Sequence, residues 1–174
     1  LSDENICVYA GTISKLKGIE YVILAARILP KVKFLLVGFV SPEFTKENWP
    51  PNVELLGRVE QKDLPKILRA ANVLLLPHPK SEYSQSPMKL FEYMASGVPI
   101  VASRLPSISE ILNDGNAVLV EAENGEALAS GIERILGDTY HSQAIAKKAH
   151  NDVQNYTWEK RGIAIAGFIK NLTN

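Results

Sequence analysis

The chain has 174 residues, of which 46% are hydrophobic and 22% are charged, an ordinary composition for one globular domain with a substantial core. Lys plus Arg and Asp plus Glu both number 19, so the net charge gives no indication of a nucleic-acid partner. The single cysteine, Cys7, excludes a disulfide framework, and no apolar run approaches the roughly 18 residues of a membrane span. The N-terminus also lacks a signal-peptide pattern, so a cytoplasmic location is the default expectation.

The N-terminal region bears on domain organisation. The chain has no initiator Met, and its first strand-like run begins within the first ten residues. We therefore expect a piece of a longer protein. Within it there is no internal repeat and no low-complexity segment, so residues 1–174 are expected to form a single domain.

Short apolar runs alternate with helix-like segments along the chain. The β-strands are expected at residues 6–10, 33–38, 53–56, 73–76, 98–102 and 117–120. The helices are expected at residues 17–29, 60–71, 86–96, 107–112, 125–136, 140–154 and 157–172. This alternation is typical of an α/β protein and predicts a Rossmann-like open parallel sheet of about six strands with helices on both faces.

Residues 86–103, SPMKLFEYMASGVPIVAS, form the clearest helix–turn–strand unit of the chain. Ser86 is a suitable N-cap, Pro87 suits the first helical position, and Gly97 suits the left-handed residue that ends a helix. Helical spacing predicts an apolar face of Leu90, Phe91, Met94 and Ala95 and a polar face of Met88, Lys89, Glu92 and Ser96. Residues 98–102 then read as a strand that is buried on both faces.

The start of this helix is a predicted anion site. The N–H groups of a first helical turn have no intrahelical acceptor, and the helix dipole favours negative charge there. In open parallel sheets, ligands bind at the loops that follow the carboxyl ends of the strands. Those loops are expected at residues 11–17, 38–44, 57–60, 77–89 and 103–109. Because the helix starts within the fourth loop, we expect the anion to be a phosphate.

The order of the motifs YAGTISKLKG, FLLVG, VELLGRV, VLLLP, SPMKLFEYMASGVPIVAS and YTWEKR resembles the donor-binding half of group 1 glycosyltransferases. The resemblance covers nearly the whole chain, and FEYMASGVPIVAS is its most specific part. It implies a GT-B fold, in which two Rossmann-like domains face each other across a cleft. Residues 1–174 would then be the C-terminal, sugar-nucleotide-binding domain, and an N-terminal acceptor domain would be absent from this chain.

The resemblance also implies roles for individual residues. Glu92 matches the family glutamate that holds the ribose hydroxyls, and Lys17-Gly18 matches the Lys-Gly pair beside the diphosphate. A lysine there would neutralise the leaving diphosphate, so Lys17 and Glu92 are the expected catalytic residues. The expected donor-binding set is Gly11, Thr12, Lys17, Arg58, Ser84, Ser86, Met88, Lys89, Leu90 and Glu92. No prosthetic group is implied, and the histidines and cysteine show no metal-ligand spacing.

Two positions depart from the family pattern. Thr12 stands where the family usually has an arginine, and Ser84 stands where it usually has a glutamate that touches the donor sugar. The glycine-rich turn after that glutamate is replaced by residues 85–87. Lys89 is the residue expected to supply part of the missing positive charge.

The expected function is retaining transfer of a hexose-type sugar from a UDP, GDP or ADP donor to a glycan, lipid or small acceptor. The isolated domain is expected to be inactive or nearly so, and peripheral membrane contact of the full-length protein remains open. One alternative is a sugar-nucleotide epimerase, which would need acid and base carboxylates, for which Glu92 and Glu82 are the candidates. Another is a non-catalytic module that has lost donor binding, which Thr12 and Ser84 favour. A nicotinamide dehydrogenase is disfavoured because no G-x-G-x-x-G follows the first strand.

Two expectations concern packing. His78 follows a buried strand on the ligand side and is interpreted as a structural histidine rather than a site residue. Tyr156 and Trp158 are expected to pack the last helix onto the core.

Overall fold

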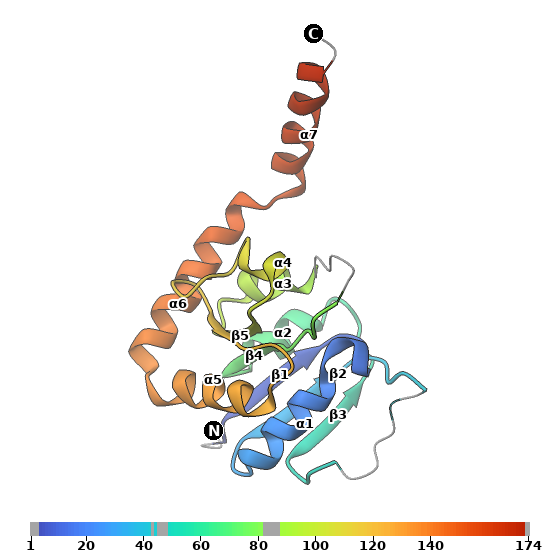
Figure 1. Ribbon diagram of the computed structural model, residues 1–174, viewed down its shortest axis with the longest axis vertical. Coiled ribbons are helices and arrows are strands. Elements are labelled where there is room, and N and C mark those ends of the chain that lie inside the picture. The colour runs from blue at the N-terminus through green and yellow to red at the C-terminus, as the bar shows by residue number, and fades with distance from the viewer. Residues whose placement is uncertain (1–3, 43, 45–48, 82–87, 173–174) are drawn as a thin grey trace.

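The computed structural model describes residues 4–42, 44, 49–81 and 88–172. Its centre is a single six-stranded sheet in which every pair of neighbouring strands is parallel (Figure 1). The strands are β1 (Ile6–Ala10), β2 (Lys33–Val37), β3 (Val53–Gly57), β4 (Val73–Leu76), β5 (Ile100–Ser103) and β6 (Val118–Val120). Their order across the sheet is β3-β2-β1-β4-β5-β6. The predicted parallel sheet of six strands is confirmed.

The helices follow the expected positions with shifted ends. They are η1 (Lys15–Lys17), α1 (Ile19–Ile28), α2 (Leu64–Arg69), α3 (Lys89–Ser96), α4 (Pro106–Ser109), α5 (Gly125–Gly137), α6 (Thr139–Asp152), η2 (Val153–Asn155) and α7 (Trp158–Leu172). The largest shift is in α2, which was expected to begin near Glu60. The chain turns there first, with the Asp63 amide bonded to the Glu60 carbonyl, and Pro65 then occupies the first helical turn.

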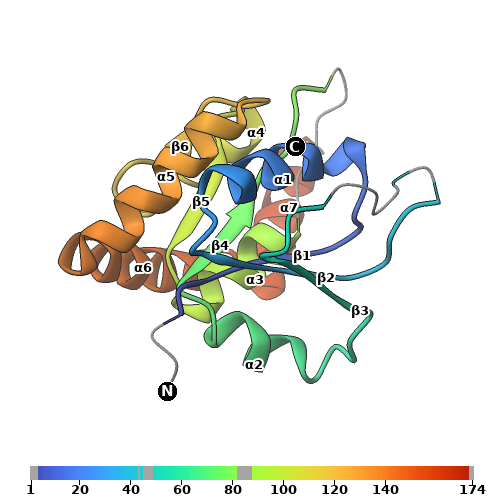
Figure 2. The same ribbon diagram turned by 90° about the horizontal axis from the view of Figure 1, so that it is seen from below.

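Two hydrophobic layers enclose the sheet. Along β1, Cys7 and Tyr9 pack with α1 and α5, whereas Val8 and Ala10 pack with α2, α3 and α4 on the opposite face. Figure 2 shows α1 and α5 on one side of the strands and α2 and α3 on the other. All four residues of β4 are buried, because a central strand of a doubly covered sheet has no solvent-facing side.

The orientation of α3 differs from the expected one. Leu90, Tyr93 and Met94 are its buried residues, and Ala95, which was expected to be buried, is exposed. The buried stripe includes Tyr93 because its hydroxyl accepts a 2.8 Å hydrogen bond from the Ala10 amide. This bond joins α3 to the end of β1 and satisfies a buried backbone donor.

Replacing Tyr93 with phenylalanine is expected to lower the free energy of unfolding by about 1–3 kcal/mol, because the buried Ala10 amide loses its acceptor. Urea denaturation measures the change. Tyr140→Phe is the matched control, since Tyr140 is 88% exposed, and it should change stability by less than about 0.5 kcal/mol. Equal effects of the two substitutions would show that the Tyr93 hydroxyl does not stabilise the fold.

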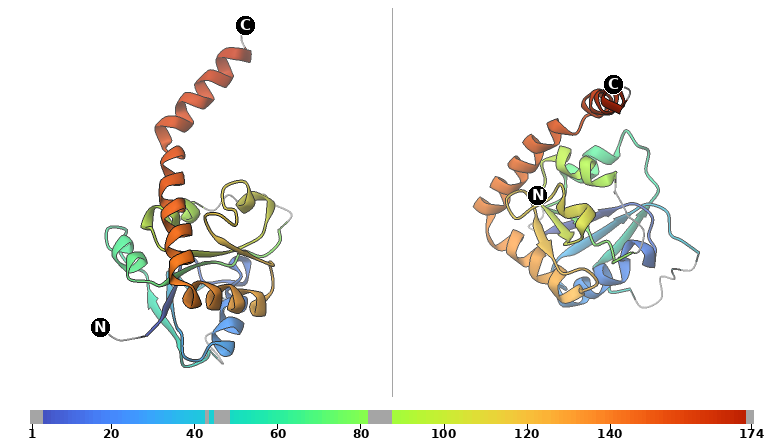
Figure 3. Two further views of the ribbon diagram at one scale, coloured as in Figure 1. Left: turned by 90° about the vertical axis from the view of Figure 1, so that its left-hand side faces the viewer. Right: turned by 45° about the horizontal axis from the view of Figure 1, so that its top comes forward.

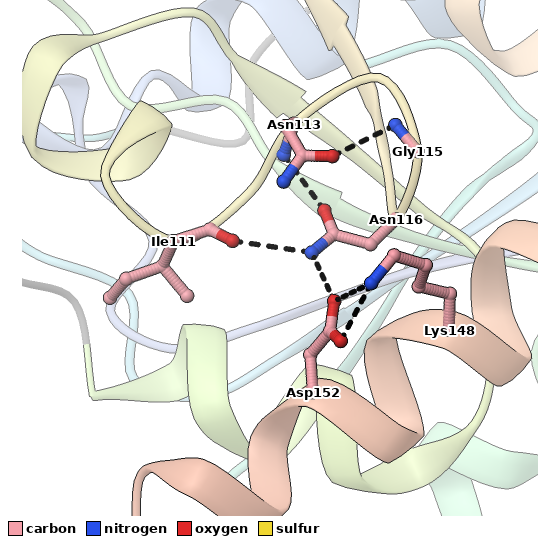
Figure 4. Close-up of polar contacts among 6 residues, drawn as sticks. All are labelled: Ile111, Asn113, Gly115, Asn116, Lys148 and Asp152. Carbon is pink, nitrogen blue, oxygen red and sulfur yellow. Dashed lines mark hydrogen bonds and ion pairs between the residues drawn. The ribbon is translucent and has the colours of Figure 1, made fainter.

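A buried asparagine holds the turn before β6 (Figure 4). The Asn116 side chain accepts from the Asn113 amide at 2.8 Å and donates to the Ile111 carbonyl at 3.2 Å and to Asp152 at 2.9 Å. Asp152 also receives two hydrogen bonds from Lys148 on α6. Hydrogen bonds from Lys148 and Asn116 to the carboxylate lower the pKa of Asp152. The cluster thereby fastens the turn to α6.

The last helix, α7, projects away from the sheet and its covering helices (Figures 1 and 3). The expectation that Trp158 packs against the core is wrong, because its side chain is 73% exposed. Tyr156 does contact Phe91 of α3, with 5.3 Å between the ring centroids. In the part of the chain that the structure describes, no helix has the length and apolar character needed to cross a membrane.

Candidate functional site

The sheet changes winding direction between β1 and β4. The helix after β1, α1, covers one face, and the helix before β5, α3, covers the other. The loops that leave β1 and β4 therefore lead to helices on opposite faces of the sheet, and the region at the carboxyl ends of these two strands is called the crevice. In open α/β sheets, this reversal point is where ligands bind. Gly11, Thr12 and Lys17 lie on the β1 side of the crevice, and His78 and Lys89 lie on the β4 side.

Glycines allow the loops around the crevice to pack backbone against backbone. A Cβ atom on Gly18, which has a φ of +73°, would lie 1.7 Å from the Pro77 carbonyl oxygen. A Cβ atom on Gly38, with a φ of +142°, would lie 1.9 Å from the Gly11 carbonyl oxygen. The loops after β1, β2 and β4 are thus held together by contacts that no larger residue permits.

Gly11 contributes its small size rather than its N–H group. Its amide donates to the Val37 carbonyl at 2.8 Å and is therefore already engaged. A Cβ atom at this position would lie 2.0 Å from Lys89 Nζ. The neighbouring Thr12 side chain is exposed, and the Thr12 carbonyl accepts a 2.9 Å hydrogen bond from the Tyr9 hydroxyl.

Lys89 provides the cation closest to Gly11. Its Nζ donates to the Tyr9 hydroxyl at 3.0 Å and lies 4.3 Å from the centroid of the Tyr9 ring. Burial and the neighbouring Lys17 lower the pKa of Lys89 to about 8, and Glu92 opposes that shift. Helical spacing predicted a polar helix face for Lys89, but the side chain is half-buried at the end of the sheet. Tyr9 was missed because an aromatic residue inside an apolar strand reads only as core.

Lys17 is the second cation of the crevice. It ends η1 and is half-buried, and its charge contributes to the pKa shifts of both Lys89 and His78. Among the residues that the structure describes, no carboxylate lies within ion-pair distance of the Lys17 or Lys89 nitrogen. Two neighbouring ammonium groups that form no ion pair with a carboxylate of the described residues favour an anionic ligand that carries more than one charge.

His78 lies beside the two lysines but adds no charge. It is 1% exposed, and within the described residues its Nδ1 has no hydrogen-bond partner. Burial, followed by the charges of Lys89 and Lys17, lowers the pKa of His78 to about 3. The imidazole is therefore neutral at physiological pH, which agrees with a structural rather than an acid–base role.

Glu92 lies three residues beyond Lys89 on α3. It is exposed and lines a groove of about 260 Å³ between α2 and α3, together with Gln61, Leu64, Pro65, Leu68, Arg69, Ala95 and Ser96. Its charge raises the pKa of Lys89, which begins the same helix. A carboxylate beside such a groove can accept hydrogen bonds from vicinal hydroxyls.

The other expected site residues lie in three different settings. Met88 directly precedes α3, and Leu90 is in its first turn, where N–H groups lack intrahelical acceptors, but the Leu90 side chain belongs to the core. Arg58 lies two strands away from β1, where its guanidinium is 4.8 Å from the Phe39 ring centroid. Ser84 and Ser86, including the predicted cap of α3, lie outside the described residues. Within the described ranges, no group of three or more His, Cys, Asp or Glu residues could hold a metal ion.

Comparison with known proteins places this arrangement in a family. A model of the family described as glycosyl transferases group 1 matches residues 4–138. An uncharacterised glycosyltransferase of Methanocaldococcus jannaschii is 28% identical in an alignment of 171 positions that covers 90% of this chain and 42% of that protein. The chain is similar in structure to sucrose-phosphate synthase from Thermosynechococcus elongatus, with a TM-score of 0.84 and 26% identity over 98% of this chain and 46% of that one.

A second solved structure, the Anabaena protein HepE in complex with UDP, has a TM-score of 0.83 and 21% identity over 97% of this chain and 49% of that chain. The chain thus spans about half the length of the relatives it matches. Its sheet matches the Rossmann-like C-terminal domain of GT-B glycosyltransferases, as the sequence predicted. With the family model matching most of its residues, the chain belongs to the group 1 glycosyltransferases.

Proposed function

We propose that residues 1–174 are the C-terminal, nucleotide-sugar-binding domain of a retaining group 1 glycosyltransferase. The observation that carries the proposal is the pair of lysines at the reversal point of the sheet. Lys89 Nζ lies beside the Gly11 backbone, Lys17 is close enough to lower the Lys89 pKa, and neither has a carboxylate partner within ion-pair distance among the described residues. The UDP bound to HepE, a structural neighbour, supports a nucleotide ligand.

In this proposal the donor diphosphate lies between Lys17 and Lys89, and the first-turn amides of α3 contact its distal phosphate. Glu92 accepts hydrogen bonds from the ribose hydroxyls in the groove between α2 and α3. The donor can be a UDP, GDP or ADP sugar of the hexose type.

The chemistry follows from this placement. The bond between the sugar and the diphosphate oxygen breaks, and its electron pair remains on the diphosphate. Lys17 and Lys89 stabilise that developing charge, the effect that usually dominates in group transfer. The acceptor hydroxyl, held by an N-terminal domain, attacks from the face that the diphosphate leaves, and its proton passes to the departing phosphate. A glycan, lipid or small molecule can serve as acceptor, and the domain alone should turn over little or nothing.

The test is calorimetric titration of the 174-residue chain with UDP, GDP and ADP. At least one should bind, and Lys17→Ala should weaken its binding by about 10- to 100-fold, because a charge-assisted contact is lost. Lys15→Ala is the matched control, since Lys15 is an exposed lysine of the same η1 turn and should leave affinity unchanged. Glu92→Ala should weaken binding of the nucleotide and of the matching nucleoside by similar factors.

The outcomes separate the alternatives. Unchanged affinity in Glu92→Ala would remove the ribose assignment. Failure of all three nucleotides to bind would overturn the proposal and favour a non-catalytic module, which the replacements Thr12 and Ser84 would then explain.

A further inference from the structure

A single buried tyrosine connects the two sides of the crevice. The Tyr9 side chain is fully buried, and its hydroxyl donates to the Thr12 carbonyl at 2.9 Å. The same oxygen accepts the 3.0 Å hydrogen bond from Lys89 Nζ, which also lies 4.3 Å from the ring centroid. The tyrosine therefore offers the ammonium both an acceptor and an aromatic face.

This contact determines where the lysine charge lies. Lys89 begins α3 on one face of the sheet, whereas the Tyr9 ring packs in the hydrophobic layer of the other face. The lysine side chain must therefore pass over the end of β1. It does so beside Gly11, where a Cβ atom would be 2.0 Å from Nζ. Without an anchor, a flexible lysine at a helix start extends into water.

We propose that Tyr9 is a positioning residue, which holds the Lys89 ammonium beside the Gly11 backbone so that it contacts the diphosphate of a bound nucleotide. The inference rests on the proposed function, because it places the diphosphate in this crevice. Tyr9 itself contacts Lys89 and Thr12 rather than the ligand. Fixing the lysine before binding reduces the conformational entropy that is lost on association.

The charges around the lysine give the proposal a pH signature. Lys89 faces Lys17 from η1 and Glu92 from its own helix, and the nearby His78 is neutral. Burial, with a smaller contribution from Tyr93, raises the pKa of Tyr9, so the Tyr9 hydroxyl stays protonated. With the Lys89 pKa at about 8, diphosphate affinity should fall as the pH rises past that value. The hydrogen bond to Tyr9 favours the charged ammonium, so its loss should move the fall to lower pH.

The experiment measures dissociation constants of the 174-residue chain for UDP, GDP and ADP, and for uridine, guanosine and adenosine, between about pH 7.5 and 9.5. In this range the terminal phosphate, with a second pKa of about 6, is already ionised. The variants are Tyr9→Phe, Lys89→Met, their combination, and Tyr140→Phe as an exposed Tyr-to-Phe control. In parallel, NMR follows the titration of the Lys89 side chain in the ligand-free protein.

We expect Tyr9→Phe to weaken diphosphate binding by about 5- to 10-fold and Lys89→Met by about 10- to 50-fold, with nucleoside binding unchanged. The double variant should bind no more weakly than Lys89→Met, because Tyr9 acts through the lysine. Tyr9→Phe should also lower both the NMR midpoint of Lys89 and the pH at which affinity falls. A general loosening of the loop would instead weaken binding equally at every pH.

Four results would overturn the inference. Unchanged affinity and pH midpoint in Tyr9→Phe, or additive losses in the double variant, would overturn it and leave the proposed function intact. An unchanged Lys89 midpoint in ligand-free Tyr9→Phe would show that the tyrosine does not hold the charge. Failure of the unsubstituted chain to bind any of the nucleotides would overturn the proposed function, and with it the ligand role of Lys89.

Discussion

Gly18→Ala is expected to lower the free energy of unfolding by more than about 3 kcal/mol. Gly18 has a φ of +73°, and a Cβ atom there would lie 1.7 Å from the Pro77 carbonyl oxygen and 2.9 Å from its carbonyl carbon. The substituted chain must therefore separate the loop after β1 from the end of β4, in addition to carrying the strain of a left-handed alanine. Urea denaturation at neutral pH measures the loss.

Gly57→Ala is the control that measures the cost of the left-handed backbone conformation alone. Gly57 also has a φ of +73°, but a Cβ atom there would meet nothing within 4 Å. Its substitution should therefore lower stability by about 1 kcal/mol only, the usual penalty for a left-handed alanine. Similar losses in the two variants would show that the Gly18–Pro77 contact does not hold the loops together.

The second large effect is a loss of stability in acid that depends on His78. Burial, with the charges of Lys89 and Lys17, lowers the pKa of folded His78 to about 3, against 6.5 in the unfolded chain. Between these values the unfolded state binds a proton that the folded state does not bind, so stability falls as the pH falls below about 6.5. Linkage gives a loss of about 2 kcal/mol between pH 7 and pH 5 from this one residue.

A comparison with His78→Asn tests this loss. Other groups titrate in the same way in both proteins, so the difference between their pH slopes reports His78 alone. The loss between about pH 7 and pH 5 should be smaller in His78→Asn by about 2 kcal/mol, whatever its stability at neutral pH. An NMR titration that places the folded His78 midpoint near 6.5 would contradict the prediction.

Local patterns were sufficient to predict the parallel sheet and the order of strands and helices along the chain. The strands β1 and β4 have the predicted ends, because a short β-branched and apolar run bounded by polar or glycine residues can be satisfied only as a buried strand. Helix ends were less well predicted. The residues around Glu60 and Pro65 have helical spacing, but the turn that precedes α2 depends on bonds formed by the backbone itself.

The polar faces were harder to predict than the elements. Lys89 and Tyr93 lie in adjacent turns of one short helix. From helical spacing alone, Lys89 is expected to be exposed, and the burial of Tyr93 is not determined. Their partners decide otherwise, since Tyr9 is 80 residues before Lys89 and Ala10 is 83 residues before Tyr93. No periodicity within a helix carries information about a partner at that distance.

By itself the sequence determined the six-stranded α/β architecture and the family. It also gave the lysine and glutamate positions from which a nucleotide site was predicted. Apolar spacing and the order of motifs can be read directly along the chain, without knowledge of its tertiary contacts. Only the tertiary structure decided that Lys89 crosses the end of β1 to Tyr9, that Gly18 lies against Pro77, and that His78 is buried beside two ammonium groups. The physical reason is the strand order, in which β4 pairs with β1 and not with β3, the strand that precedes it in the chain. That order brings together the loops after β1 and β4, which are about 65 residues apart in the chain. The burial of His78 and the effect of the two lysine charges on it are consequences of that contact.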